Sequence, residues 1–433
     1  MSTPAKFSTG ILIFIVMVCC GASAVADTTI LKFRQLVDGT GEVLPHREIA
    51  VAGELIVAIG DSLSDQFPGA SLIDLGDLTA LPGLIDVHVH ITYGLGDPPD
   101  GDAWEKLFAS SAADRLVAAK QNARKMLGSG VTSARDLFAF DGVDFQIKAL
   151  IDQGTIPGPR LFVSGGGFHP STLKPLPDGE ERDIVTEFSE TVRERIAAGA
   201  DWIKIFATTG SADDLSSTQN FYYPEIKAVT DIAHAAGIRV AVHSYGPSAV
   251  EDALRAGVDS IDHPIGMDRN LLKRWAQTDT TYVPTIDHNR YYAEYSSEYG
   301  YDSDVEQSLY DFIKKNVETL RRANEAGVRV AMGSDAVMSM FGQNTRELEW
   351  FIEAGMTTAQ ALQAATINGA ILLGQEGKLG RLKIDYAADI IAVQGDPLEN
   401  IHAVTRNVVW VMKAGKVFHD RDDLSETALV GQQ

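Results

Sequence analysis

Cysteine is almost absent from this chain of 433 residues. It occurs twice, as Cys19 and Cys20, and both lie in the apolar run at 11–20. If that run is removed from the mature protein, no disulfide can form and no thiolate can bind a metal. Any metal would then need nitrogen and oxygen ligands. Stability must come from a buried core and from any metal that binds.

The apolar run at 11–20 lacks the length of a membrane-spanning helix. It is too short to cross a bilayer as a stable helix, Lys6 precedes it, and the small residues Ala24 and Ala26 follow. This order predicts a signal peptide at 1–26, cleaved after Ala26 or, as second choice, after Ala24. An uncleaved anchor and a lipoprotein are the alternatives. We therefore expect an exported protein, periplasmic or secreted, without membrane attachment after cleavage.

Positive charge is also in short supply. The chain has 37 Lys and Arg against 59 Asp and Glu, which gives a formal net charge of −22. This balance disfavours nucleic acid and anionic membranes as main partners, so a small-molecule substrate is the partner we expect. A homo-oligomer is compatible with the sequence, which does not decide the point. With 45% hydrophobic residues, the chain can bury a large core and form two domains.

A dinucleotide fingerprint is missing as well. No Gly-x-Gly-x-x-Gly opens a helix after the first predicted strand of the central region, which argues against an open dinucleotide-binding sheet. Residues 81–375 instead alternate strand and helix patterns, and we count eight strands. This count predicts an α/β fold of the TIM-like (β/α)8 barrel type. The predicted strands are LIDVHVH, VTSARD, RLFVSG, DWIKIF, IRVAVH, VDSIDH, TYVPTI and VRVAMGSD.

The two ends of the chain have a different texture. Residues 27–80 and 376–433 contain short runs in which apolar and polar residues alternate, and Gly and Asp separate the runs of the first range. Such runs are typical of short β-strands. We expect both ends, apart from a C-terminal tail, to form one small β-sandwich domain with the barrel inserted between them.

Six residues at the ends of the predicted barrel strands indicate a metal site. His88 and His90 alternate on the first strand, so both imidazoles should lie on the same face. Because barrel enzymes build their sites at the carboxyl ends of the strands, the six side chains should meet there. Imidazole and carboxylate ligands suit zinc or a similar divalent ion. The six residues are His88, His90, Lys204, His243, His263 and Asp335.

Lys204 allows two interpretations. Its alternation partners Trp202 and Phe206 are aromatic, so its amine should face inward beside the histidines and Asp335. It could form a buried ion pair with an aspartate. Among metal ions, however, the ammonium would be repelled, its pKa would fall, and the neutral amine would become available. Such an amine can take up carbon dioxide to become a carbamate, an anion able to bridge two metals.

These segments resemble the amidohydrolase superfamily, in particular the branch of zinc-dependent Xaa-Pro dipeptidases and imidazolonepropionases. The resemblance covers nearly all of the mature chain. It is carried by LPGLIDVHVH, GVTSARD, GADWIKIFATTG, IRVAVHSYG, GVDSIDHP and VAMGSDA, and by the later stretches TINGAILLG and GKLGRLKIDYAADIIAV.

The resemblance implies a centre of two divalent metal ions, with zinc as the expected metal, and a hydrolytic reaction. The first metal would be held by His88, His90 and Asp335, the second by His243 and His263, and a carboxylated Lys204 would bridge them together with a hydroxide. The hydroxide would attack an amide carbonyl that the metals polarise. Asp335 would act as general base and then as general acid toward the leaving amine.

Four further residues are candidates for binding substrate. His169 and Tyr245 are also candidate catalytic residues, because His169 could contact the substrate carbonyl or carboxylate and Tyr245 could donate to the oxyanion. The alternatives are a plain loop histidine and a tyrosine packed at the barrel rim. His288 and Arg290 open a tyrosine-rich segment at 287–302, which we expect to be a loop over the barrel mouth. There Arg290 could pair with a carboxylate, or the tyrosines could pack on each other.

The expected reaction is hydrolysis of an amide bond to a C-terminal amino acid, in a dipeptide or an N-acyl amino acid. Hydrolysis of a cyclic amide, a lactone or another non-peptide C–N bond is the alternative within enzymes. A barrel that only binds a metal or another ligand is an alternative of a different class. The intact set of six residues argues against it, because a binding relic has no need of Lys204 or Asp335.

Overall fold

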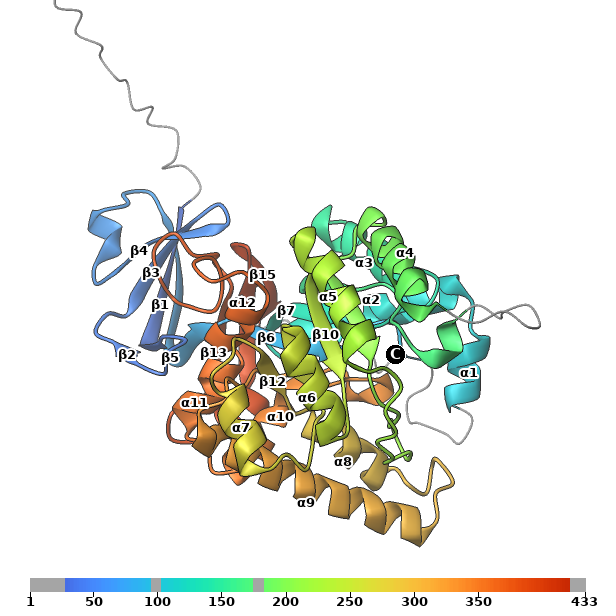
Figure 1. Ribbon diagram of the computed structural model, residues 1–433. Coiled ribbons are helices and arrows are strands. Elements are labelled where there is room, and N and C mark those ends of the chain that lie inside the picture. Colours follow the sequence, from blue (N-terminus) through green and yellow to red (C-terminus); the bar gives the residue numbers. More distant parts are fainter. Residues whose placement is uncertain (1–27, 95–102, 174–182, 421–433) are drawn as a thin grey trace, which may run out of the picture.

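The computed structural model describes residues 28–94, 103–173 and 183–420. The predicted signal peptide, with both cysteines, lies outside these residues. A small sheet domain, which the first and last described residues form together, lies beside a larger domain of strands and helices (Figure 1). Within the described ranges, no helix combines the length and the apolar character that crossing a membrane requires.

The sheet domain joins both ends of the described chain. Its strands are β1 (Thr28–Val37), β2 (Val43–Leu44), β3 (Glu48–Ala52), β4 (Leu55–Gly60), β5 (Ser71–Pro82), β13 (Ile390–Val393), β14 (Val408–Lys413) and β15 (Lys416–Asp420). Their order is β15-β14-β13-β5-β1-β3-β4, with β2 paired to β1. β5 connects the two ends, because it pairs in parallel with β1 and antiparallel with β13.

We predicted a small β-sandwich built from both chain ends, and the structure shows a domain of both ends whose strands form one hydrogen-bonded sheet. The sheet curls back on itself, because an antiparallel bridge joins Leu55 at the edge strand β4 to Ala387 just before β13. Alternate side chains of its strands meet in a core. There Phe33 and Trp410, from opposite ends of the chain, pack edge to face with ring centroids 6.5 Å apart.

The larger domain is the predicted barrel. Its regular strands run parallel in two groups, β6-β7-β8 and β9-β10-β11-β12. A parallel bridge from Phe168, after β8, to Ile205 of β9 joins the groups at one seam. The strands are β6 (Leu84–Val89), β7 (Val131–Asp136), β8 (Arg160–Val163), β9 (Trp202–Phe206), β10 (Arg239–His243), β11 (Ser260–Asp262) and β12 (Thr281–Val283).

The eighth predicted strand, at 328–335, is irregular but closes the second seam. The backbone amide of Ala331 donates to the carbonyl oxygen of Tyr282 on β12 at 3.0 Å. The amide of Asp335 donates to the carbonyl oxygen of His88 on β6 at 2.7 Å. The segment therefore lies between β12 and β6, and the prediction of a (β/α)8 barrel is confirmed.

Gly333 explains how this segment can approach its neighbours so closely. A Cβ at this position would lie 2.4 Å from Cγ1 of Val283 and 2.8 Å from Cβ of His88. Any larger residue would push the segment away from both flanking strands. Two residues later Asp335 adopts a φ of 52°, a conformation that ends strand geometry.

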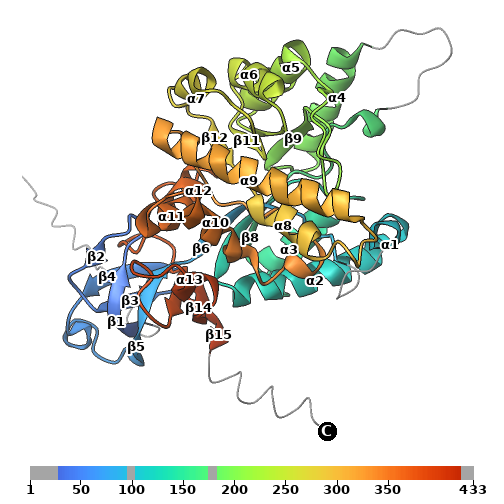
Figure 2. The same cartoon turned by 90° about the horizontal axis from the view of Figure 1, so that it is seen from below.

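Helices follow the strands and surround the barrel (Figure 2). They are α1 (Ala103–Ala109), α2 (Ala112–Gly128), α3 (Val143–Asp152), α4 (Ile184–Ala197), α5 (Tyr223–Ala235), α6 (Pro247–Ala256), α7 (Arg269–Trp275), α8 (Ile286–Glu294), α9 (Ser303–Ala326), α10 (Glu347–Glu353), α11 (Thr358–Ala364), α12 (Ile367–Leu372) and α13 (His402–Thr405). Short 3-10 turns lie at Leu63–Asp65, Pro170–Thr172, Met338–Met340 and Asn344–Arg346.

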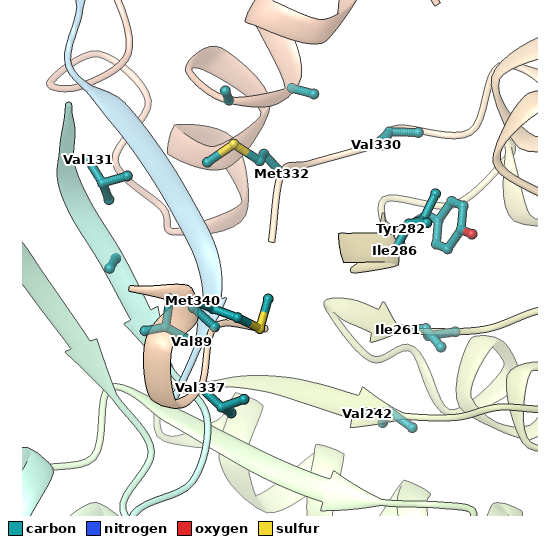
Figure 3. Packing of buried hydrophobic residues seen from close by; sticks show 14 of the residues in the cluster. Val89, Val131, Val242, Ile261, Tyr282, Ile286, Val330, Met332, Val337 and Met340 are labelled. Atoms are coloured by element: carbon teal, nitrogen blue, oxygen red, sulfur yellow. The ribbon is translucent and has the colours of Figure 1, made fainter. Parts of the chain in front are cut away.

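Strand alternation divides the barrel residues into two buried sets. Val242, Ile261 and Tyr282 belong to the large cluster that includes the apolar faces of the helices (Figure 3). Their neighbours Ala241 and Val283 belong to a second cluster. This is the period-2 pattern expected of strands buried on both faces, one toward the helices and one toward the barrel interior.

The tyrosine-rich segment after β12 differs from its prediction as a loop. Residues 286–294 form helix α8, and Tyr291 and Tyr292 on it are 1% and 0% exposed. The tyrosines pack on each other, with Tyr291 and Tyr295 centroids 5.0 Å apart and Tyr292 and Tyr299 centroids 5.2 Å apart. The tyrosines that we expected on a loop over the barrel mouth therefore pack together in the core of a helix and the loop that follows it.

Candidate metal centre and active site

The six predicted metal ligands meet at one end of the barrel. Five of them lie at or near the carboxyl end of a strand or at the end of the 328–335 segment, and Lys204 is the middle residue of β9. All six line one cavity of about 250 Å³. His90 is the most exposed of them, with 12% of its side chain accessible. The convergence that barrel topology predicted is therefore present in the structure.

His88, His90 and Asp335 form the first group of possible ligands. Oδ1 of Asp335 lies 3.5 Å from Nε2 of His88 and 3.1 Å from Nε2 of His90. One ligand atom from each residue lies within 4.8 Å of the other two. Since metal bonds to nitrogen and oxygen are about 2.0–2.2 Å long, one ion could contact all three.

His243 and His263 form the second group. Their ring centroids are 4.7 Å apart, and the His263 ring is also 4.7 Å from the ring of His88. Nδ1 of His263 lies 2.6 Å from the hydroxyl of Thr285, which leaves Nε2 as its ligand atom. Nε2 of His243 is buried without a hydrogen-bond partner among the described residues. A buried nitrogen without a partner is costly, and a bound metal would satisfy it.

Burial keeps these imidazoles neutral. Together with the charge of Lys204 it lowers the pKa of His88 to about 4 and that of His243 to about 3. Burial and the neighbouring His243 hold the pKa of His263 well below its usual value. Because neutral imidazole is the form that binds a metal, the donor set fits a divalent ion at neutral pH.

Lys204 faces the same cavity, and the carboxylate beside it is Asp262. Nζ lies 3.5 Å from Oδ2 of Asp262 and 5.3 Å from the centre of the Phe206 ring. Burial lowers the pKa of Lys204 to about 8, although Asp262 and Asp335 oppose the shift. A fraction of the amine is therefore neutral near pH 8. The partner in the ion-pair interpretation is Asp262.

Asp262 was not among the predicted site residues. Its Oδ2 lies 3.0 Å from Nδ1 of His88, and its Oδ1 lies 3.5 Å from Nη2 of the buried Arg135. Burial opposes its ionisation, but the charges of Arg135 and Lys204 outweigh that and hold the pKa of Asp262 below its usual range. The signal in the sequence was its alternation with Ser260, which puts both side chains on the same strand face. The hydroxyl of Ser260 accepts a hydrogen bond from Nη1 of Arg135 at 3.0 Å.

Asp86 was also missed, although it alternates with His88 and His90 on the first strand. It accepts hydrogen bonds from the amide and the hydroxyl of Ser334, at 3.0 and 2.6 Å, and from the amide nitrogen of Asn344 at 2.9 Å. Burial raises the pKa of Asp86 to about 6. This carboxyl group ties the eighth barrel segment to the strand that carries both first histidines.

Strained backbone is concentrated around the ligands. His263, Thr285 and Asp335 have φ values of 71°, 51° and 52°, in the left-handed region that side chains other than glycine rarely adopt. His263 directly follows β11, Thr285 is the second residue after β12, and Asp335 ends the 328–335 segment. Such strain is typical of functional sites, where the surrounding packing holds side chains in positions that an ordinary strand would not give them.

Three of the four predicted substrate-binding residues line the cavity: His169, Tyr245 and His288. Tyr245 stacks on His243 with centroids 5.0 Å apart, and burial raises its pKa, so the phenol keeps its proton as a donor. Nδ1 of His169 lies 2.7 Å from the hydroxyl of Ser171. Nδ1 of His288 lies 2.8 Å from the carbonyl oxygen of Asp335, so His288 also supports a ligand.

The structure does not bring Arg290 to the cavity. Its guanidinium is buried on α8, where Nη2 and Nε donate to the carboxylate of Asp287 at 2.6 and 2.9 Å. Nη1 donates to Glu294 at 2.5 Å. Pairing with a substrate carboxylate would require this guanidinium to leave two acids, and Arg290 instead holds α8 together. We therefore correct its placement among the substrate-binding residues.

Comparison with known proteins agrees with this geometry. The chain is 26% identical over 426 residues to an ochratoxinase of Aspergillus niger, covering 91% of this chain and 87% of the relative. It is 24% identical to an imidazolonepropionase of Rubrobacter xylanophilus, covering 87% and 92%. Among solved structures, a Xaa-Pro dipeptidase with methionine bound in its active site superposes with a TM-score of 0.79, at 31% identity, covering 90% of this chain and all of that one.

The sequence pattern of the amidohydrolase family matches residues 79–418, which include the whole barrel and the returning strands β13 and β14. The resemblance found in the motifs is therefore confirmed. The alternative of a barrel that only binds a ligand is excluded. The chain belongs to the amidohydrolase family and is a hydrolase that acts on amide bonds.

Proposed function

We propose that this protein is a binuclear metal-dependent amidohydrolase that releases a C-terminal amino acid from a dipeptide or an N-acyl amino acid. The observation that carries the proposal is the convergence of six nitrogen and oxygen donors on one cavity, where burial lowers the pKa of His88 and His243 and so favours their neutral, metal-binding form. The names of the relatives support an amide substrate. The methionine in the active site of the similar dipeptidase supports an amino acid as one product.

The donor set divides into two metal positions. The residues that would hold the first are His88, His90 and Asp335, those for the second are His243 and His263, and Lys204 would bridge them. Two such ions, expected to be zinc because all donors are nitrogen or oxygen and imidazole dominates, would supply Lewis acidity and an acidified water when bound. The cavity end of the barrel leaves room for substrate beside them.

Lys204 would act as a carbamate. Its neutral amine can form a nitrogen–carbon bond to carbon dioxide and release one proton, which turns a neutral group into an anion. Burial favours this step because it disfavours the ammonium form, as the lowered pKa of about 8 indicates. Asp262, with Oδ2 3.5 Å from Nζ, opposes this step because its charge stabilises the ammonium form.

Asp335 is the residue we assign to proton transfer. Its carboxylate lies beside His90 and His288 and lines the cavity. It would accept a proton from the water and deliver it to the amine as the carbon–nitrogen bond breaks. Tyr245 would donate its phenolic hydrogen to the carbonyl oxygen as negative charge develops there.

A second candidate is hydrolysis of a cyclic amide. The similarity to an imidazolonepropionase favours it, since an imidazolone is a cyclic amide. The deciding experiment is a panel of Xaa-Pro dipeptides, N-acyl amino acids, cyclic amides and lactones, assayed with metal content measured on the same sample. We expect turnover of linear amides that end in a free amino acid. Turnover confined to the cyclic compounds would overturn the first proposal.

Metal stoichiometry tests the binuclear centre separately. Elemental analysis of the purified protein should find close to two divalent ions per chain. Lys204→Ala should lose at least one of them, because the bridge between the two positions is removed. Tyr222→Ala, a change at an exposed residue that does not line the cavity, serves as control and should keep both. Full activity with one tightly held ion would contradict the bridged arrangement.

Asp335→Asn separates metal binding from proton transfer. The amide keeps the shape of the carboxylate, so much of the metal should stay. The kcat should fall by roughly 10²–10⁴-fold because the amide cannot shuttle a proton. Release of the amino acid is the measurement, with Asp279→Asn at a fully exposed position as control. Unchanged kcat in the metal-loaded variant would remove Asp335 from this role.

Asp262→Asn tests the carboxylate beneath the ligands. The carboxylate of Asp262 faces Nδ1 of His88. A carboxylate in this position orients a metal-binding imidazole, because it bonds the ring nitrogen that does not bind the metal. Replacing it should weaken metal retention by roughly 10–100-fold. Chelator competition measures this without any substrate. Asp231→Asn, on an exposed part of α5, should leave the affinity unchanged, and an equal loss in both variants would show that Asp262 has no specific effect.

A further inference from the structure

One side of the cavity consists of aromatic rings and carries none of the six ligands. We call it the aromatic wall. Its rings come from two neighbouring places, the stretch from β6 to α1 and the stretch after β7. They belong to Tyr93, Trp104, Phe108, Phe138 and Phe140, all of which line the cavity.

The rings form a continuous surface. Tyr93 and Phe140 stack at 5.8 Å with an interplanar angle of 13°, and Trp104 and Phe108 stack at 6.0 Å and 24°. The two pairs meet edge to face, at 89° between Tyr93 and Trp104 and 81° between Phe108 and Phe140. Tyr93 also stacks on His90 at 4.8 Å and 21°. The wall therefore begins at a metal ligand and runs outward.

Arg115 on α2 holds the wall in place from behind. Its guanidinium lies 4.6 Å from the centre of the Phe140 ring and donates to Asp141 at 2.6 Å, next to that ring in the chain. It also donates to the carbonyl oxygen of Leu107 at 3.0 Å, at the end of α1 that carries Phe108. Because Arg115 connects both stretches, the wall is preformed, which lowers the entropy cost of binding a flat group.

The wall is not fully covered by the protein itself. Phe108 is 62% exposed, and Trp104, Phe138 and Phe140 are partly exposed. A large apolar ring left in water at the mouth of a cavity gains free energy when a ligand covers it. Aromatic groups gain more than aliphatic ones here, since stacked and edge-to-face contacts add to the burial of area.

A second group of lining residues carries hydrogen-bonding groups and comes from the stretches after β8, β9 and β10. We call it the polar end, and it consists of His169, Ser171, Thr172, Ser211 and Tyr245. The ring of Phe206 connects the two groups, with its centroid 5.7 Å from that of Phe138 and 5.5 Å from that of His169. A substrate carboxylate would find more donors at the polar end than on the wall, where the donors are the phenol of Tyr93 and the indole N–H of Trp104.

From this division we infer that the substrate carries a flat aromatic acyl group, bound against the aromatic wall, while its amino-acid carboxylate lies toward the polar end. The substrate class is therefore aroyl amino acids, or dipeptides whose first residue is aromatic. The inference rests on the proposed release of a C-terminal amino acid and adds which side of the scissile amide carries the ring.

The test compares acyl groups on one constant leaving amino acid. N-acetyl-, N-cyclohexanecarbonyl-, N-benzoyl- and N-(2-naphthoyl)-leucine differ in the acyl group alone. We expect kcat/KM to rise about a hundredfold from acetyl to benzoyl or naphthoyl. It should be about three- to tenfold higher for benzoyl than for cyclohexanecarbonyl, the excess that ring contacts supply. Equal values for the acetyl and aroyl substrates would overturn the inference and leave the proposed function standing.

Variants of the wall locate the effect. Phe108→Ala and Phe140→Ala should each lower the ratio of kcat/KM for naphthoyl over acetyl by about tenfold, mainly through KM for the aroyl substrate. Tyr222→Ala removes an exposed aromatic ring elsewhere and should leave the ratio unchanged. An unchanged ratio in both wall variants would place the aromatic group somewhere else and overturn the assignment.

A binding measurement keeps the inference testable without hydrolysis. Titration calorimetry with 2-naphthamide, a neutral compound without an amino-acid carboxylate, should show binding to the metal-loaded protein that Phe108→Ala weakens about tenfold. If linear N-acyl amino acids are not hydrolysed but naphthamide binds at the wall, the proposed function fails while the aromatic site stands. If naphthamide binds both proteins equally, the wall is not its site.

Discussion

The charge of Asp262 is the constraint on which the rest of the site depends. A carboxylate with no exposed surface is costly unless positive or hydrogen-bonding groups neutralise it. Arg135 faces it from one side, with the ring of Trp202 4.3 Å from its guanidinium carbon, and His88 and Lys204 face it from the other. The same charge orients His88 and faces the amine of Lys204, whose ammonium form it stabilises while burial disfavours it. Stability and ligand geometry are therefore set by the same buried group.

Closure of the barrel imposes the second condition. The segment at 328–335 reaches β6 and β12 because Gly333 has no Cβ, and Asp86 holds it through Ser334 and Asn344. At its end Asp335 takes up a left-handed conformation, which turns its carboxylate toward His88 and His90. The conformational strain at the ligand is sustained by the hydrogen bonds just behind it. The same short stretch of backbone therefore closes the barrel and positions a candidate metal ligand.

The cavity combines these ligands with two unlike sides. Aromatic rings from α1 and from the stretch after β7 line it together with polar residues that follow β8, β9 and β10. Because barrel loops come from different strands, each side can be changed without disturbing the ligands at the strand ends. Metal chemistry and substrate preference are carried by separate parts of the chain. That separation fits a family whose similar members carry different substrate names.

The barrel and the six candidate metal ligands could be predicted from the sequence, because strand alternation and the carboxyl-end rule combine local patterns with one topology. The family followed from the resemblance of the motifs. The folded structure supplied what those patterns do not encode. It placed Asp262 beside Lys204, folded 286–294 into a helix, and gave Arg290 two acids of its own. Contacts between distant strands depend on register and on the packed interior. Spacing along the chain shows which residues can face the centre, and only packing decides which of them touch.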